Sequence, residues 1–216
     1  LDIAAYRKEI LSVKETFKDK LDIGWGIELG LQPYLEKENQ AVITNYDFDF
    51  VIGSTHVVKQ VDIYYPAYYE GRNEEDCYRE YFEETLKNAQ SNVDFDVYGH
   101  LDYVVRYGPN KNKFYSYQKY ADVIDEILRT LIQKGKGLEL NTAGFKYGLG
   151  HAHPIIPVLK RYKELGGEII TLGSDGHAPE QIAWDFDKVP SILKEAGFEH
   201  FTVFHNRKPE FHKITI

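Results

Sequence analysis

Apolar and polar residues follow two different periods along the chain, which predicts helices and strands in turn. In residues 1–18 apolar side chains recur every three or four positions, the spacing of an amphipathic helix. Residues 21–31 form an apolar run interrupted by glycines, which predicts a buried strand. Residues 33–41 are helical in pattern, and the apolar run 48–53 predicts a second strand. The chain therefore begins in the order helix, strand, helix, strand.

The same alternation continues to the end of the chain. Residues 63–72 predict an ordered loop, whose tyrosines could line a pocket by stacking, although packing against the fold is favoured. Helices are predicted at 74–89, 116–133, 154–165 and 189–196, and strands at 95–98, 137–140, 168–172 and 201–204. This order is typical of βαβ units and a parallel sheet, either closed as a barrel or doubly wound. In both, the loops at the carboxyl ends of the strands carry the chemistry.

Acidic and imidazole side chains stand where these predicted strands end. Glu28 ends the first strand, His56 follows the second, His100 follows the third, and Asp175 with His177 follow the fifth. A single histidine in such a place is more often satisfied by a backbone hydrogen bond than used as a ligand. Four strand ends bearing such groups together predict a metal site on one rim of the fold.

The residue types narrow the metals that such a site would hold. Imidazole and carboxylate ligands without cysteine suit zinc, iron or manganese, and Glu28 is the candidate to bridge two ions. Two ions about 3.5–4 Å apart can activate a water and hold phosphoryl oxygens, the arrangement that phosphoester hydrolysis requires. More than one divalent ion and a hydrolytic reaction are therefore expected.

Composition excludes several other classes of function. The 216 residues suit one large domain, and the formal net charge of -8 argues against a general nucleic-acid or membrane surface. No apolar run approaches the ~18 residues of a membrane span. Cys77 is the single cysteine, so no disulfide can form within the chain, and a cytoplasmic location is expected. The expected partner is a small phosphate ester, and a homo-oligomer is left open.

Five segments carry a resemblance to a known family. GIELGL, FVIGSTH, YGHLDYVVRYG, LELNTAG and YKELGGEIITLGSDGHAP resemble successive motifs of the PHP (polymerase and histidinol phosphatase) family, over nearly the whole chain. The resemblance implies a distorted, TIM-like (β/α)7 barrel with a trinuclear metal cluster at the strand ends. It also implies that the metal ligands are Glu28, His56, His100, Asp175 and His177.

One motif of the family is missing from this sequence. Family members begin with a His-x-His pair on the first strand, and no such pair precedes Glu28. His151 and His153 have that spacing but lie between a glycine-rich loop and Pro154, where an ordinary surface loop is favoured over a ligand pair. The chain is therefore expected to be a single PHP domain, residues 1–216, that lacks roughly fifty N-terminal residues of the usual domain length and with them its first strand or strands.

Several further polar residues are candidates for binding substrate. Arg106 follows His100 by six residues and could clamp a phosphate with two donors, the alternative being a solvated surface arginine. Lys146 is a weaker candidate for the same task, as is Arg207. Asn141 could hold a water or a substrate amine. Asp102 could accept a hydrogen bond from the imidazole of His100, or cap a turn.

The resemblance implies a specific reaction, the hydrolysis of L-histidinol phosphate to L-histidinol and phosphate in histidine biosynthesis. In that reaction Arg106 would offset charge on the phosphoryl oxygens, and Asp175 or His177 would assist proton transfer to the departing alkoxide. One alternative is another PHP phosphoesterase, acting on a nucleotide, a sugar phosphate or phosphotyrosine. A second is a catalytically incomplete fragment that serves as a binding module.

Overall fold

A parallel sheet of five strands forms the centre of the protein, in a computed structural model that describes residues 1–215. The strand order is β1 (Gly26–Gly30), β2 (Phe50–Ser54), β5 (Val97–Tyr98), β6 (Gly137–Asn141) and β7 (Ile170–Gly173). All four pairings are parallel, which confirms the predicted α/β class. The edges β1 and β7 are not paired with each other, so among residues 1–215 the sheet is open and not a closed barrel.

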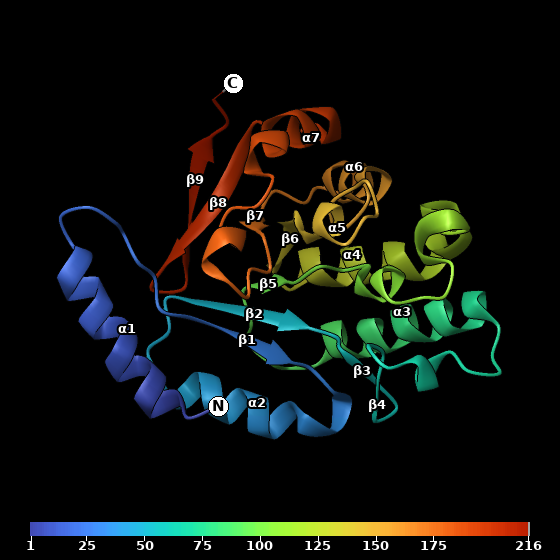
Figure 1. Ribbon diagram of the computed structural model, residues 1–216, viewed down its shortest axis with the longest axis horizontal. Helices are drawn as coiled ribbons and strands as arrows, with labels where there is room; N and C mark the ends of the chain where they lie inside the picture. The colour runs from blue at the N-terminus through green and yellow to red at the C-terminus, as the bar shows by residue number, and fades with distance from the viewer. Residues whose placement is uncertain (216) are drawn as a thin grey trace.

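Two antiparallel hairpins accompany the central sheet. The first, β3 (Val57–Val58) with β4 (Val61–Asp62), follows the end of β2. The second, β8 (His200–His205) with β9 (Lys208–Lys213), stands beside β7 (Figure 1). The predicted strand at 201–204 is therefore confirmed as part of β8. Every residue of β9 is exposed.

Seven α-helices lie within residues 1–215, the first of them before β1. They are α1 (Ile3–Phe17), α2 (Glu36–Asn45), α3 (Glu74–Gln90), α4 (Ala121–Gln133), α5 (Ala143–Lys146), α6 (Ile156–Glu164) and α7 (Val189–Ala196). Short 3₁₀ helices lie at Pro33–Leu35, Pro66–Tyr68, Tyr103–Arg106, Lys111–Lys113, Tyr117–Tyr120, Pro179–Gln181 and Phe186–Lys188. Helices α3 and α4 lie side by side, whereas α1 stands at one edge of the molecule (Figure 1). No helix in the described part of the chain is long and apolar enough to cross a membrane.

Local sequence explains where these helices begin and end. The side chain of Asn73 accepts a hydrogen bond from the backbone N–H of Glu75 and caps α3, which buries Tyr81 and Phe82 on its inner face. Gly135, with φ of +67°, follows α4 and turns the chain back toward the sheet. Helix α3 confirms the predicted helix at 74–89. The predicted helix at 116–133 is also confirmed, but it begins as the 3₁₀ helix Tyr117–Tyr120 and continues as α4.

The first strand is shorter than the sequence pattern predicts. Residues 21–25 lie outside β1, and the backbone N–H of Trp25 donates to the carboxylate of Asp49 at 2.8 Å. The Asp49 side chain thus accepts the hydrogen bond that a neighbouring strand would otherwise accept from this backbone. The same end of the sheet is tied by Asp96, which accepts from the N–H of Val51 at 2.7 Å and from Nε of Arg207 at 2.6 Å. Arg207 therefore lies at the amino ends of the strands, away from the predicted rim.

Candidate metal centre and its pocket

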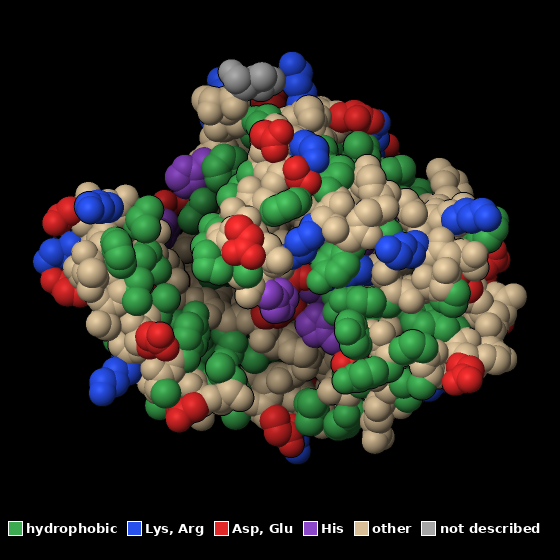
Figure 2. All heavy atoms as spheres, viewed as in Figure 1, with side chains coloured by type: hydrophobic (Ala, Val, Ile, Leu, Met, Phe, Trp, Pro, Cys, Tyr) green, Lys and Arg blue, Asp and Glu red, His purple; other side chains and the backbone are tan. Residues whose placement is uncertain are grey.

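Three of the residues expected as ligands meet at the carboxyl ends of β1, β2 and β5. Nε2 of His100 lies 3.1 Å from Oε1 of Glu28, and Nε2 of His56 lies 3.3 Å from the same oxygen. The two imidazole nitrogens are 3.3 Å apart, so one ligand atom from each residue falls within 4.8 Å of the others. Histidine side chains gather at the centre of the face seen in Figure 2, over the ends of these strands. Three lone-pair donors that converge in this way suit a divalent cation.

The charges at this cluster hold Glu28 ionised. Burial by itself would raise the pKa of the Glu28 carboxyl, but hydrogen bonds and positive charge from His100 and His56 bring that pKa well below its usual range. Burial would likewise lower the pKa of His100, yet its hydrogen bond to Glu28 raises it. The ring of Tyr103 packs against both imidazoles, with centroids 4.6 Å from His100 and 4.9 Å from His56. The cluster is therefore anionic at Glu28 and confined by an aromatic side chain.

Sequence reasoning missed Glu139, which lies beneath this cluster on β6. Glu139 is 5% exposed, and its carboxylate accepts a hydrogen bond from the backbone N–H of His100 at 2.9 Å. A Cβ atom at Gly173 would lie 2.0 Å from Oε1 of Glu139, so only glycine leaves room for this carboxylate at the end of β7. Burial raises the pKa of Glu139. The one available signal was an acid between two leucines in a strand whose other residues are apolar, apart from its last.

Asp175, His177 and Arg106 lie in the same pocket as the cluster but do not belong to its tight group of three. The pocket has a volume of about 430 Å³ and is lined by Glu28, His56, Asp62, Tyr64, His100, Tyr103, Arg106, Tyr107, Tyr147, Asp175 and His177. Oδ2 of Asp175 accepts from Nη1 of Arg106 at 2.6 Å. The side chain of His177 is 77% exposed, and its Nδ1 lies 3.1 Å from the backbone oxygen of Asp175. The structure therefore places all five expected ligands around one cavity, three of them in mutual contact.

Arg106 is not the solvated surface residue of the alternative interpretation, because it is only 3% exposed. Its guanidinium carbon lies 4.3 Å from the ring centroid of Tyr147 and 4.7 Å from that of Tyr103. Burial would lower its pKa, but the bond to Asp175 raises it. Nε and Nη2 of Arg106 are buried and have no hydrogen-bond partner within residues 1–215. Two donors of a buried cation that lines the pocket are therefore unpaired among the described residues.

The other two candidates for substrate binding, Asn141 and Lys146, do not line this pocket. The amide of Asn141 is used within the chain, since Nδ2 donates to Glu139 at 3.1 Å and Oδ1 accepts from the N–H of Ala143 at 2.9 Å. Nζ of Lys146 donates to the backbone oxygen of Asp175 at 2.9 Å and to Gln181 at 3.1 Å. Both residues support the loops around the pocket in this structure.

The prediction of a surface loop for the His-Ala-His segment is wrong for His153, which is fully buried. Its Nδ1 lies 2.5 Å from Oδ1 of Asp102, whose other oxygen accepts from the N–H of Ile155 at 3.0 Å. Asp102 therefore does not accept from His100, whose Nδ1 is buried without a partner among the described residues. Burial lowers the pKa of His153 to about 4, although Asp102 opposes that shift. His151 is half-buried, and its Nδ1 is 2.8 Å from the backbone oxygen of Ala152.

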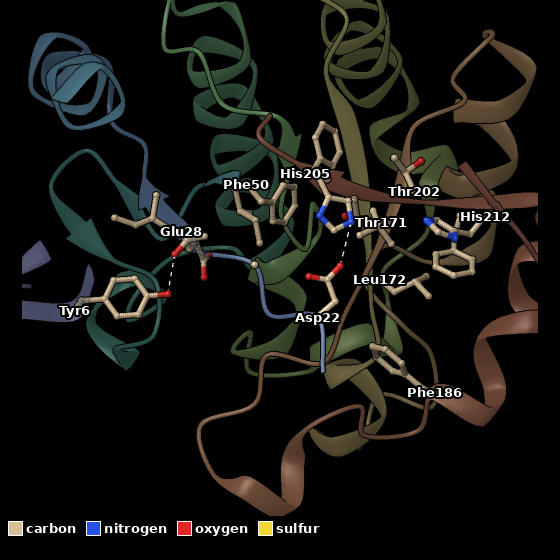
Figure 3. Close-up of a pocket in the computed structure, with 17 residues that line it drawn as sticks. Tyr6, Asp22, Glu28, Phe50, Thr171, Leu172, Phe186, Thr202, His205 and His212 are labelled. Atoms are coloured by element: carbon tan, nitrogen blue, oxygen red, sulfur yellow. Dashed lines mark hydrogen bonds and ion pairs between the residues drawn. The ribbon is translucent and has the colours of Figure 1, made fainter. Parts of the chain in front are cut away.

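A second, larger cavity of about 720 Å³ lies between the open edges of the sheet (Figure 3). Its lining is mostly apolar and includes Phe50, Leu172 and Phe186. Figure 3 shows Asp22 pointing toward His205, to which it is paired at 3.5 Å. Of the expected ligands only Glu28 lines this cavity, so the chemistry belongs to the smaller pocket on the other side of Glu28.

Comparisons with known proteins identify the family of this chain. The family model described as PHP domain matches residues 2–143. A histidinol-phosphatase of Lactococcus lactis is 33% identical over 217 residues, which is 100% of this chain and 80% of the relative. A probable histidinol-phosphatase of Clostridium acetobutylicum is 30% identical over 174 residues, 81% of this chain and 68% of the relative.

Two solved structures have a similar fold. The crystal structure of the histidinol phosphate phosphatase from Lactococcus lactis, in complex with zinc, L-histidinol and phosphate, superposes with a TM-score of 0.84 at 32% identity. The superposition covers 97% of this chain and 80% of that one. A crystal structure from Listeria monocytogenes has a TM-score of 0.71 at 18% identity, covers 87% of this chain and 75% of that one, and supports the fold alone.

Proposed function

This chain belongs to the PHP domain family, and from that premise we propose that it is a metal-dependent phosphatase that hydrolyses L-histidinol phosphate to L-histidinol and phosphate. The convergence of Glu28, His56 and His100 beside the buried guanidinium of Arg106 is the observation that carries the proposal. It puts cation ligands and an anion-binding group in one pocket. The reaction would belong to histidine biosynthesis in the cytoplasm.

The donor set fits two or three divalent ions. One ion would be held by Glu28, His56 and His100, whose ligand atoms already face one another, and Asp175 with His177 would supply further ligands across the pocket. Zinc is favoured because the Lactococcus lactis relative was solved with zinc, while iron and manganese take the same ligand types. When bound, such ions would lower the pKa of a water and offset charge on the phosphoryl oxygens.

The side chains of the pocket would then bind and orient the ester. Arg106 offers Nε and Nη2 to phosphoryl oxygens, and its contacts with Asp175 and the Tyr147 ring fix the plane of its guanidinium. His177 is exposed at the mouth with Nδ1 beside the backbone oxygen of Asp175. Its Nε2 would therefore be the atom that acts, either as the ligand named above or, where it holds no ion, as the group that gives a proton to the departing alkoxide oxygen.

A panel of phosphate monoesters tests the proposal. The zinc-loaded protein is expected to release phosphate from L-histidinol phosphate with a kcat/KM at least about tenfold above that for a nucleotide, a sugar phosphate or phosphotyrosine. Faster hydrolysis of any of these would assign a different PHP phosphoesterase activity. Zinc bound in stoichiometric amount, with no hydrolysis of any ester, would support a binding module instead.

A further inference from the structure

Asp62 is a carboxylate of the pocket that is neither one of the proposed metal ligands nor a proposed contact of the phosphate. It ends β4, on the short hairpin that follows His56, and it lines the same cavity as the metal cluster. Its Oδ1 accepts a hydrogen bond from the backbone N–H of Tyr64 at 2.8 Å, which leaves Oδ2 without a bond within residues 1–215. A hydrogen bond within its own loop therefore holds the Asp62 side chain in place and leaves its second carboxylate oxygen unpaired.

The other two carboxylates that line this pocket each have a cationic or imidazole partner. Glu28 faces His56 and His100, and Asp175 is paired with Arg106. Among the described residues no lysine, arginine or histidine lies within 4.0 Å of the carboxylate of Asp62. The negative charge of Asp62 is thus uncompensated at one end of the pocket, while the end with Arg106 and the metal ligands would bind a phosphate.

A row of tyrosine rings joins these two parts of the pocket. Tyr64, next to Asp62 in the chain, packs edge-on against Tyr107 with centroids 5.2 Å apart. Tyr107 in turn lies 6.3 Å from Tyr147, the ring that stacks on Arg106. Tyr64 is 56% exposed, so its ring is open to a ligand entering the pocket. Aromatic faces of this kind favour flat or cationic groups.

On the basis of the proposed phosphatase activity, we infer that Asp62 binds the ammonium group of the substrate, and that Tyr64 and Tyr107 flank its ring. The phosphate of the substrate faces Arg106 and the metal ligands, and the amine faces the unpaired carboxylate. This end of the pocket therefore selects small phosphate esters that carry a positively charged amine. Neutral and anionic esters lose this contact, because the half-buried carboxylate of Asp62 cannot pair with a neutral group and repels an anionic one.

Substitution Asp62→Asn separates this role from a structural one. Asparagine keeps an oxygen that can accept from the N–H of Tyr64, so the turn is preserved and only the charge is removed. The substrates compared are L-histidinol phosphate and its Nα-acetyl derivative, which has the same phosphate and imidazole without the ammonium charge. Glu70→Gln, an exposed carboxylate on the following loop, is the matched control for loss of one charge.

The zinc-loaded wild type is expected to prefer the free amine by about 10- to 100-fold in kcat/KM, the range for a hydrogen bond to a charged group. Asp62→Asn is expected to lose most of that preference, mainly through KM, whereas Glu70→Gln retains it. Asp62→Glu, which keeps the charge, is expected to retain more of the preference than Asp62→Asn. Equal losses on both substrates in Asp62→Asn, or no preference in the wild type, would overturn the inference. Failure of the wild type to hydrolyse either ester would instead overturn the proposed phosphatase activity.

Discussion

The carboxylate of Glu139, on β6, accepts a hydrogen bond from the backbone N–H of His100, 2.9 Å away, although His100 lies just past the end of β5 and 39 positions earlier in the chain. This bond forms where His100 has a φ of +22°, an uncommon conformation for a residue other than glycine. The imidazole of His100 points to Glu28 from that backbone. Glu139 is thus a positioning residue that acts through His100.

Loss of this positioning should weaken metal binding. Replacement of Glu139 by alanine removes the acceptor for the His100 N–H, and we expect zinc affinity to fall about 10- to 100-fold, as for other residues that orient metal ligands. Glu139→Gln, which retains one acceptor oxygen, should lose less. Competition with a chromophoric chelator measures both affinities. Wild-type affinity in Glu139→Ala, with the melting temperature lowered, would show that Glu139 only stabilises the fold.

The expected ligands themselves should be indispensable for turnover. His100→Ala removes a donor from the group of three, and Asp175→Ala removes both a pocket carboxylate and the partner of Arg106. Each variant is expected to lower kcat for L-histidinol phosphate by at least about 100-fold. His200→Ala, an exposed histidine at the start of β8, serves as the control. Wild-type kcat in either site variant would rule out the assigned site.

Arg106 should not tolerate replacement by lysine. An ammonium cannot offer two parallel donors to a phosphoryl group or stack between the rings of Tyr103 and Tyr147 as a guanidinium does. We expect Arg106→Lys to reduce kcat/KM about 10- to 100-fold, the range for charged hydrogen bonds. Arg129→Lys, on the outer side of α4, makes the same exchange away from the pocket. Equal kinetics for the two variants would show that Arg106 has no contact with substrate.

The part of the site that could be predicted from the sequence is the part that the pairing of parallel strands brings together. Glu28 pairs in register with Ile52, and Gly53 with Tyr98, so the carboxyl ends of β1, β2 and β5 are neighbours. Polar side chains that follow those ends must then meet, which is why Glu28, His56 and His100 could be identified from strand pattern alone.

Other contacts could not be predicted because no local pattern encodes them. Asp102 and His153 are 51 positions apart and meet through the packing of two irregular loops. In the sequence Glu139 occupies a position of β6 where an apolar core residue is usual. Its carboxylate fits there only because residue 173, on another strand, is a glycine. Closure of the sheet is also a non-local property, since it depends on whether β1 and β7 pair directly.

The buried pair of His153 and Asp102 should make the stability of the fold depend on pH in a defined window. The pKa of His153 is lowered from 6.5 to about 4, so the folded protein holds this imidazole neutral, with Nδ1–H donating to an ionised Asp102. Above pH 6.5 the stabilisation is fully present, because the histidine is neutral in both the folded and the unfolded state. As the pH falls from 6.5 to 4 the unfolded state takes up a proton first, and the free energy of unfolding decreases. The slope is at most about 1.4 kcal/mol per pH unit, and the total loss is about 3 kcal/mol.

Urea unfolding at intervals between pH 7 and pH 4 measures this slope, with His153→Asn as the matched variant. Asparagine can still donate to Asp102 from a position close to that of Nδ1 but does not titrate. The variant should be less stable at pH 7, because it leaves a cavity where the ring was, yet its free energy of unfolding should decline less steeply toward pH 4. Parallel curves for the two proteins would mean that His153 is protonated as readily in the folded chain as in the unfolded one, in conflict with its complete burial.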